Sequence, residues 1–165
     1  MRLRPYTSYT DFQIISTWIT DERTHALWSA GRFQFPMTEE GFETALKEAA
    51  LRSGDHAFVA TEDDGKVVGF FCYSVNTESN EGMLKFVMVD NSLRGKGYGR
   101  LMLELAVKYA FEITNVDMVH LNVFSVNTAA KKCYLNAGFT ERNVTDNAFT
   151  YNGESWGRCN MARFK

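Results

Sequence analysis

The sequence has few of the features that mark secreted, membrane-spanning or metal-binding proteins. Its three cysteines, Cys72, Cys133 and Cys159, are widely spaced without a CxxC pair, which indicates neither a disulfide framework nor a zinc site. No run of about eighteen apolar residues occurs, and the opening MRLRPYTSYTDF lacks the apolar core of a signal peptide. We therefore expect a cytoplasmic protein with no membrane span and no bound metal.

Charge of one sign and chain-breaking residues are also scarce. The 18 basic and 20 acidic residues leave a formal net charge of −2, so no overall field favours nucleic acid or an anionic membrane as a partner. Only two prolines occur, and no repeat or low-complexity segment marks a linker. Because 45% of the residues are apolar, the chain can bury a substantial core, and we expect one domain over residues 1–165.

Hydrophobic periodicity predicts a mixed chain in which helices come first and strands dominate later. The predicted helices cover residues 9–20, 22–30, 39–53, 99–113 and 128–137. The predicted strands cover residues 1–5, 56–62, 66–76, 83–90, 118–124, 140–151 and 156–164. Asp63-Asp64-Gly65 and Asn152-Gly153 are typical of hairpin turns.

A glycine-rich segment joins the strand at 83–90 to the helix at 99–113, with the sequence Arg94-Gly95-Lys96-Gly97-Tyr98-Gly99. Glycines allow close approach of the backbone to a ligand, and a helix N-terminus presents free N–H groups, so a strand, turn and helix in succession favour an anion such as pyrophosphate. The segment matches neither GxxxxGK[ST] nor GxGxxG, which disfavours both nucleotide motifs. A tight connection without a ligand is the alternative, and the two cationic residues in the turn count against it.

A second pattern lies downstream on a predicted strand end, helix and helix C-cap, and reads Asn127-x-x-Ala130-x-x-x-Tyr134-x-x-x-Gly138-Phe139. With this pattern the sequence resembles the GCN5-related N-acetyltransferase (GNAT) family, whose cofactor motif Arg/Gln-x-x-Gly-x-Gly/Ala is matched by Arg94, Gly97 and Gly99. The element order fits that family over nearly the whole chain. The segments RLRPY, DERTHALWSAGRF and FVMVDNSLRGKGYG look most like bacterial members near the ribosomal-protein alanine acetyltransferases.

The resemblance implies an α+β fold with a central mixed, mostly antiparallel sheet of six or seven strands, splayed into a V and flanked by four or five helices. It implies acetyl-CoA as cosubstrate, with a gap between Val89 and Val123 that admits the pantetheine arm. The residues expected to bind the cofactor are Val87, Met88, Val89, Arg94, Gly95, Lys96, Gly97, Tyr98, Gly99, Asn127 and Tyr134.

Direct attack of an amine on a thioester needs an oxyanion donor, a proton for the leaving thiolate and a route for the amine's proton. The resemblance assigns Tyr134 as the catalytic acid, and the backbone N–H of Met88 is the candidate oxyanion donor. Two of these roles have a structural alternative. The Tyr134 ring could instead be a core residue, and Asn127, expected to contact the cofactor, could instead be the N-cap of the following helix.

The base and the acceptor pocket are less defined. The strand at 83–89 has no carboxylate, which leaves Glu81, Glu22, His25 or a water chain as the route for the proton, whereas His56 and His120 are expected to be structural. Aromatic residues of the first helices and the last hairpin either line the acceptor pocket or fill the core: Trp18, Trp28, Phe33, Phe35 and Trp156.

The leading hypothesis is an acetyl-CoA-dependent N-acetyltransferase that acts on a primary amine of a small molecule or a protein N-terminus. A non-catalytic acyl-CoA-binding sensor module is the alternative, motivated by the missing strand carboxylate. A general nucleotide-binding domain ranks last because neither a Walker lysine nor a ribose-binding acid is evident. In this family final strands can mediate dimers, so a homodimer is possible.

Overall fold

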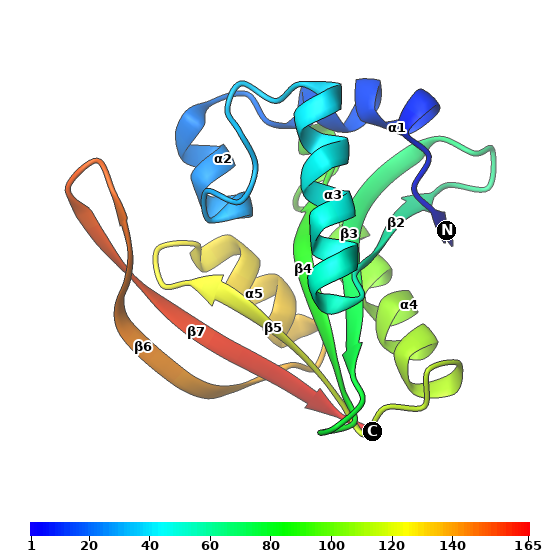
Figure 1. Cartoon of the computed structure of the whole chain (residues 1–165). Helices are drawn as coiled ribbons and strands as arrows, with labels where there is room; N and C mark the ends of the chain where they lie inside the picture. Colours follow the sequence, from blue (N-terminus) through cyan, green and yellow to red (C-terminus); the bar gives the residue numbers. More distant parts are fainter.

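A computed structural model describes all 165 residues, and its seven strands form a single sheet in the order β1-β2-β3-β4-β5-β7-β6 (Figure 1). The strands are β1 (Arg2–Pro5), β2 (His56–Thr61), β3 (Val67–Asn76), β4 (Glu81–Val89), β5 (Met118–Phe124), β6 (Thr140–Tyr151) and β7 (Glu154–Phe164). Only β4 and β5 run parallel to each other; every other neighbouring pair is antiparallel. The predicted mixed, mostly antiparallel sheet is confirmed.

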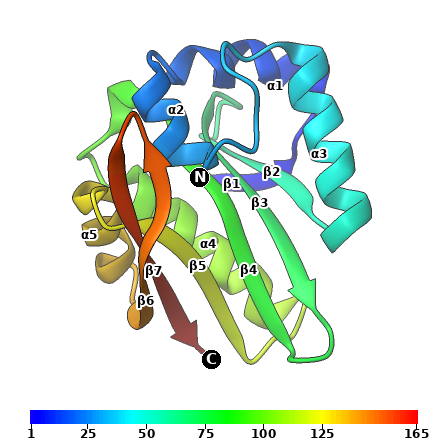
Figure 2. The ribbon, with the colours of Figure 1, turned by 60° about the vertical axis from the view of Figure 1, so that its left-hand side comes forward.

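Five helices cover the two faces of this sheet (Figure 2). They are α1 (Ser8–Ile15), α2 (Glu22–Ser29), α3 (Glu39–Ser53), α4 (Tyr98–Glu112) and α5 (Thr128–Asn136), with 3₁₀ turns at Ser16–Trp18 and Asn91–Leu93. One core cluster joins α1 and α3 to β3 and β4, and a larger one joins α4 and α5 to the opposite face of the sheet. No helix is long and apolar enough to cross a membrane.

Local sequence signals explain most element boundaries. The Thr38 side chain accepts a hydrogen bond from the Gly41 N–H at the start of α3, and Gly54 ends that helix in a left-handed conformation with φ of 64°. The strand expected from residue 83 begins two residues earlier. Gly82 lies in this extension and masks the strand pattern in the sequence, since glycine is a poor strand former. The fold requires glycine here, because a Cβ at this position would lie only 2.5 Å from the Tyr73 hydroxyl.

The sheet separates between β4 and β5. Their pairing covers only the register from Glu81 opposite Met118 to Leu84 opposite Leu121, although β4 continues to Val89. A bulge accompanies the separation: the register with β3 shifts by one residue, and Phe86 has a φ of 52°. The predicted V is therefore present.

Candidate functional site

The glycines of the turn between β4 and α4 serve two different purposes. Gly95 and Gly97 have φ values of 75° and 86°, and a Cβ added to either would meet no atom within 4 Å. Their backbone conformation requires glycine, and the space beside them is open. Gly99 is different, because a Cβ there would lie 3.0 Å from the Cys133 sulfur of α5. Gly99 thus permits close packing of α4 on α5.

The turn presents a group of free backbone donors. No backbone or side-chain acceptor within the chain receives the N–H groups of Gly95, Gly97, Tyr98, Gly99 and Arg100. These amides lie at the positive end of the 15-residue helix α4, with no side chain capping it. An open cradle of unpaired N–H groups at a helix N-terminus fits a pyrophosphate, as the sequence predicts. The side chains of Arg94 and Lys96 are exposed beside it.

Tyr98 contributes differently from the glycines. Its hydroxyl donates a hydrogen bond of 2.6 Å to a Glu62 carboxylate oxygen at the end of β2, and this hydrogen bond raises the pKa of the Tyr98 hydroxyl. The side chain therefore fastens the turn to the sheet. Its backbone N–H is the part of Tyr98 that remains available to an anion.

The free edge of β4 has a defined set of donors and acceptors. Along two antiparallel strands, hydrogen-bonded and non-hydrogen-bonded residue pairs alternate. Because Asp90 N–H donates to Val68 O, the next hydrogen-bonded pair along β4 is Met88 with Phe70. The Met88 amide is therefore expected to face β3, which disfavours the oxyanion-donor role predicted for it. Alternation directs the Val87 carbonyl and both backbone groups of Val89 toward the gap instead.

Val87 N–H is the better-placed oxyanion donor. The Phe86 carbonyl accepts a hydrogen bond of 2.8 Å from the Trp28 indole on α2. In a trans peptide the C=O and the following N–H point in opposite directions, so Val87 N–H points away from α2 and toward the side of the sheet that carries α4 and α5. Tyr134 lies on that side.

Tyr134 combines a buried ring with a free hydroxyl. The ring belongs to the larger core cluster and is 8% exposed. Burial raises the pKa of Tyr134 well above its ordinary value, so the hydroxyl keeps its proton at neutral pH. That hydroxyl has no hydrogen-bond partner within the chain, yet its oxygen is not enclosed. Asn127 caps α5 by accepting from Ala130 N–H, which is the structural role considered for it.

The candidate bases differ sharply in their surroundings. Glu81 lies six residues before Val87, roughly 20 Å along the strand, and approaches Arg142 at 3.9 Å, which places it away from the gap. Glu22 is exposed at the start of α2. His25, also on α2, is only 4% exposed, and burial lowers its pKa.

The other two histidines lie on strands of the sheet. His120 on β5 contacts the Asn160 side-chain nitrogen at 3.2 Å, and His56 is exposed at the start of β2. The sequence did not reveal a short ion pair on β4, in which Lys85 lies 2.6 Å from the buried Asp55 carboxylate. Only the fold brings these two residues, thirty positions apart, together.

The aromatic residues divide between core and site. Trp18, Phe33 and Trp156 are buried and contribute to the core, whereas Trp28 stacks on Phe33 with 4.9 Å between ring centroids and reaches β4. Phe35, which is 38% exposed, lies in the segment between α2 and α3.

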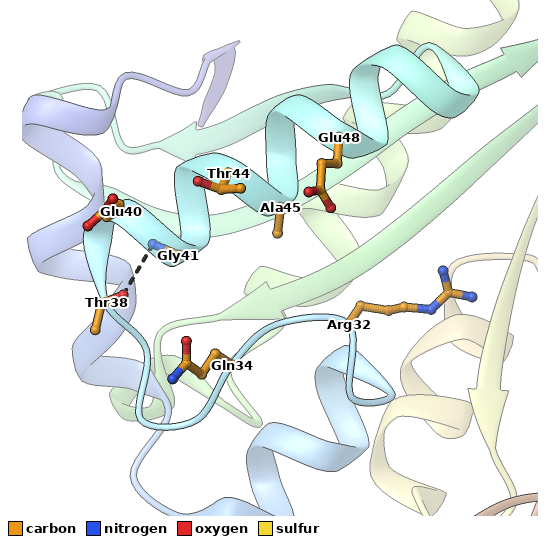
Figure 3. Close-up of a pocket in the computed structure, with 8 residues that line it drawn as sticks. All are labelled: Arg32, Gln34, Thr38, Glu40, Gly41, Thr44, Ala45 and Glu48. Atoms are coloured by element: carbon orange, nitrogen blue, oxygen red, sulfur yellow. Dashed lines mark hydrogen bonds between the residues drawn. The ribbon is translucent and has the colours of Figure 1, made fainter.

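A surface groove of about 380 Å³ opens between that segment and α3 (Figure 3). Its lining is mostly polar and consists of Arg32, Gln34, Thr38, Glu40, Gly41, Thr44, Ala45 and Glu48. None of these residues belongs to the glycine-rich turn, to β4 or to α5. The groove therefore lies on the helical side of the molecule, apart from the predicted cofactor contacts.

Known proteins resemble this chain in both sequence and structure. An uncharacterised N-acetyltransferase of Methanocaldococcus jannaschii is 29% identical over 89 residues, which are 54% of this chain and 56% of that protein. A spermine/spermidine N(1)-acetyltransferase of Bacillus subtilis is 28% identical over 97 residues, covering 55% of this chain and 61% of the relative. The chain thus spans less than two thirds of the length of these relatives.

A crystal structure of spermidine N-acetyltransferase from Vibrio cholerae in complex with CoA and spermine shares the fold. It has a TM-score of 0.82 and 19% identity, and the match covers 99% of this chain and 94% of that one. A family model described as the Acetyltransferase (GNAT) family matches residues 17–139. The resemblance predicted from the two motifs is confirmed, and the chain belongs to the GNAT acetyltransferase family.

Proposed function

We propose that this protein is an acetyl-CoA-dependent N-acetyltransferase that transfers acetyl to a primary amine of a small molecule or a protein N-terminus. The observation that carries the proposal is the separation of β4 from β5 immediately before the glycine-rich turn. It leaves the backbone edge of Val87 and Val89 open beside the free amides of the turn, so one extended ligand with a pyrophosphate at one end can contact both.

The chain's own groups supply the chemistry around a thioester, which is what acetyl-CoA brings when bound. The free amides from Gly95 to Arg100 would hold the pyrophosphate, and the edge of Val87 and Val89 would pair with the pantetheine amides. Val87 N–H would stabilise negative charge on the thioester carbonyl oxygen, because a fixed dipole needs no reorganisation as charge develops. Tyr134, protonated at neutral pH, would donate to the leaving thiolate.

A second candidate function is an acyl-CoA sensor without turnover. It is motivated by the strand Met83–Val89, which carries Lys85 but no carboxylate base. The unpartnered hydroxyl of Tyr134 favours the enzyme, because a tyrosine that only packed in the core of a sensor would not need an available hydroxyl group. Cytoplasmic location and homodimer formation remain predictions.

Thiol release from acetyl-CoA against a panel of amines tests the proposal. The wild-type protein should acetylate at least one amine, and Tyr134→Phe should lower kcat by about 100-fold or more while the Kd for CoA stays within about twofold. Tyr73→Phe is the matched control, since it removes a hydroxyl that bonds Thr114 at 2.7 Å and lies outside the predicted site. CoA binding without any acetylation would favour the sensor.

A further inference from the structure

Helix α2 spans the place where the sheet separates. On one side, its Trp28 indole donates to the Phe86 carbonyl of β4. On the other side, Ala26 packs in a cluster with Phe124 of β5 and Trp156 of β7. The helix therefore bridges the two arms of the V on the face opposite α4 and α5.

Two buried polar residues lie on the face of α2 between these contacts. With about 3.6 residues per turn, positions 25 and 29 project between positions 26 and 28. His25 is 4% exposed and Ser29 is fully buried. Both side chains are thus directed between the arms of the sheet, where the acceptor of the proposed reaction must approach the thioester.

The hydrogen bonds of Ser29 determine which nitrogen of His25 carries the proton. The Ser29 hydroxyl accepts from Gly31 N–H at 3.2 Å and lies 3.4 Å from His25 Nδ1. The Ser29 hydroxyl makes no other hydrogen bond within the chain, so we assign its own proton to Nδ1. His25 is then the tautomer with Nε2–H, because the neutral ring has one donor and one acceptor.

Nε2 is enclosed and has no hydrogen-bond partner within the chain. A buried donor without a partner costs about 1–3 kcal/mol, so such a group marks a place where a ligand or ordered water completes the hydrogen bonding. The Phe35 ring lies 5.2 Å from the His25 ring, centroid to centroid, and is itself 38% exposed. Movement of the Phe35 side chain would uncover one side of the His25 ring.

The charges around α2 limit what that ligand is. Burial lowers the pKa of His25, so the ring is neutral at pH 7 and offers an N–H but no charge. Of the nearby carboxylates, Glu154 is paired with Arg23 at 2.8 Å, Asp55 with Lys85 at 2.6 Å, and Asp21 caps the start of α2, which leaves Glu22 as the exposed carboxylate of that helix. A molecule with several ammonium groups therefore finds only one unpaired carboxylate on α2.

We propose that His25 is a specificity-determining residue whose Nε2–H donates to a carbonyl or carboxylate oxygen next to the reacting amine. The acceptor class is then an amino acid derivative or a peptide N-terminus rather than a polyamine. Glu22, exposed one turn before His25, offers a single carboxylate to the single ammonium of such a molecule. This inference rests on the proposed acetyltransferase activity and specifies its acceptor.

Matched acceptors test the inference through thiol release. Phenylalaninamide and 2-phenylethylamine differ by the carboxamide alone, and spermidine provides the polyamine arm. His25→Leu should raise KM for phenylalaninamide about tenfold, the effect of one hydrogen bond, while the KM for 2-phenylethylamine stays within about twofold. His25→Gln keeps a hydrogen-bond donor at a similar distance from the backbone, so its KM for phenylalaninamide should be close to that of the wild type.

Other outcomes separate the two proposals. An equal increase in KM for both aromatic amines in His25→Leu would overturn the inference but not the proposed acetyltransferase activity. A preference for spermidine that His25→Leu leaves unchanged would do the same. Absence of acetylation of every amine would remove the proposed function and the inference with it. Ring ¹⁵N NMR gives a readout that needs no activity: we expect a His25 proton on Nε2 with Nδ1 as acceptor, and a proton on Nδ1 would contradict the argument.

Discussion

Substitution of Gly97 by valine separates the folding role of the turn from its binding role. The φ of 86° at Gly97 lies where a β-branched residue is strained, which costs about 1–3 kcal/mol of unfolding free energy. No atom lies within 4 Å of the added Cβ, so no steric clash increases this cost. For a chain of this size, each kcal/mol lowers Tm by about 2–4 °C, so the variant should fold and melt several degrees below wild type.

The effect on cofactor binding should be much larger. The valine side chain would fill the open space beside the free amides, and relaxation of φ would turn those amides away. Loss of two charge-assisted hydrogen bonds, about 3 kcal/mol in all, raises the Kd for CoA by about 100-fold. Isothermal titration calorimetry with CoA measures this directly.

Gly65 supplies a matched control for backbone strain. It has a φ of 91°, no atom within 4 Å of an added Cβ, and a position in the hairpin between β2 and β3. Gly65→Val should therefore lose similar stability but bind CoA like wild type. If Gly97→Val bound CoA normally, or if both variants lost affinity equally, the assignment of the turn to the pyrophosphate would be refuted.

Two further predictions concern stability. Tyr134→Phe should change Tm by no more than about 2 °C, because the hydroxyl it removes has no partner and the ring stays packed; a differential scanning fluorimetry shift of several degrees would contradict this. Burial alone raises the pKa of Asp11, but hydrogen bonds from Arg4, Thr7 and Thr10 outweigh it and hold that pKa below its ordinary value. The resulting stability is present above about pH 4 and is lost as pH falls through the lower folded-state pKa. Asp11→Asn should therefore reduce the loss of unfolding free energy at acid pH, measured by urea unfolding at a series of pH values. An unchanged acid dependence would exclude Asp11 as its source.

The fold was largely predictable from local patterns. Hairpin turns and the glycine-rich turn each act through neighbouring residues, so the turns at Gly65 and at Arg94 to Gly99 were predictable from the sequence alone. The start of β4 and the break between α1 and the 3₁₀ turn at Ser16–Trp18 were not predicted, because tertiary contacts such as the packing of Gly82 against Tyr73 decide them.

The site was predictable where the backbone carries the function. The turn and the gap followed from motifs that constrain local conformation, and those motifs also indicated the family. The direction of an amide on β4 depends on the register with β3 and on the bulge at Phe86, neither of which the sequence indicates. For this reason the sequence indicates Met88 as the oxyanion donor, whereas the register and the bulge favour Val87. The buried environment of His25 likewise arises only when α2 packs across both arms of the sheet.

A crystal structure of the protein with CoA tests the central claim most directly. The account predicts pyrophosphate on the free amides from Gly95 to Arg100, pantetheine amides paired with Val87 and Val89 between β4 and β5, and the thiol sulfur within hydrogen-bond distance of the Tyr134 hydroxyl. CoA bound elsewhere, or a pantetheine arm that does not enter the gap, would contradict it.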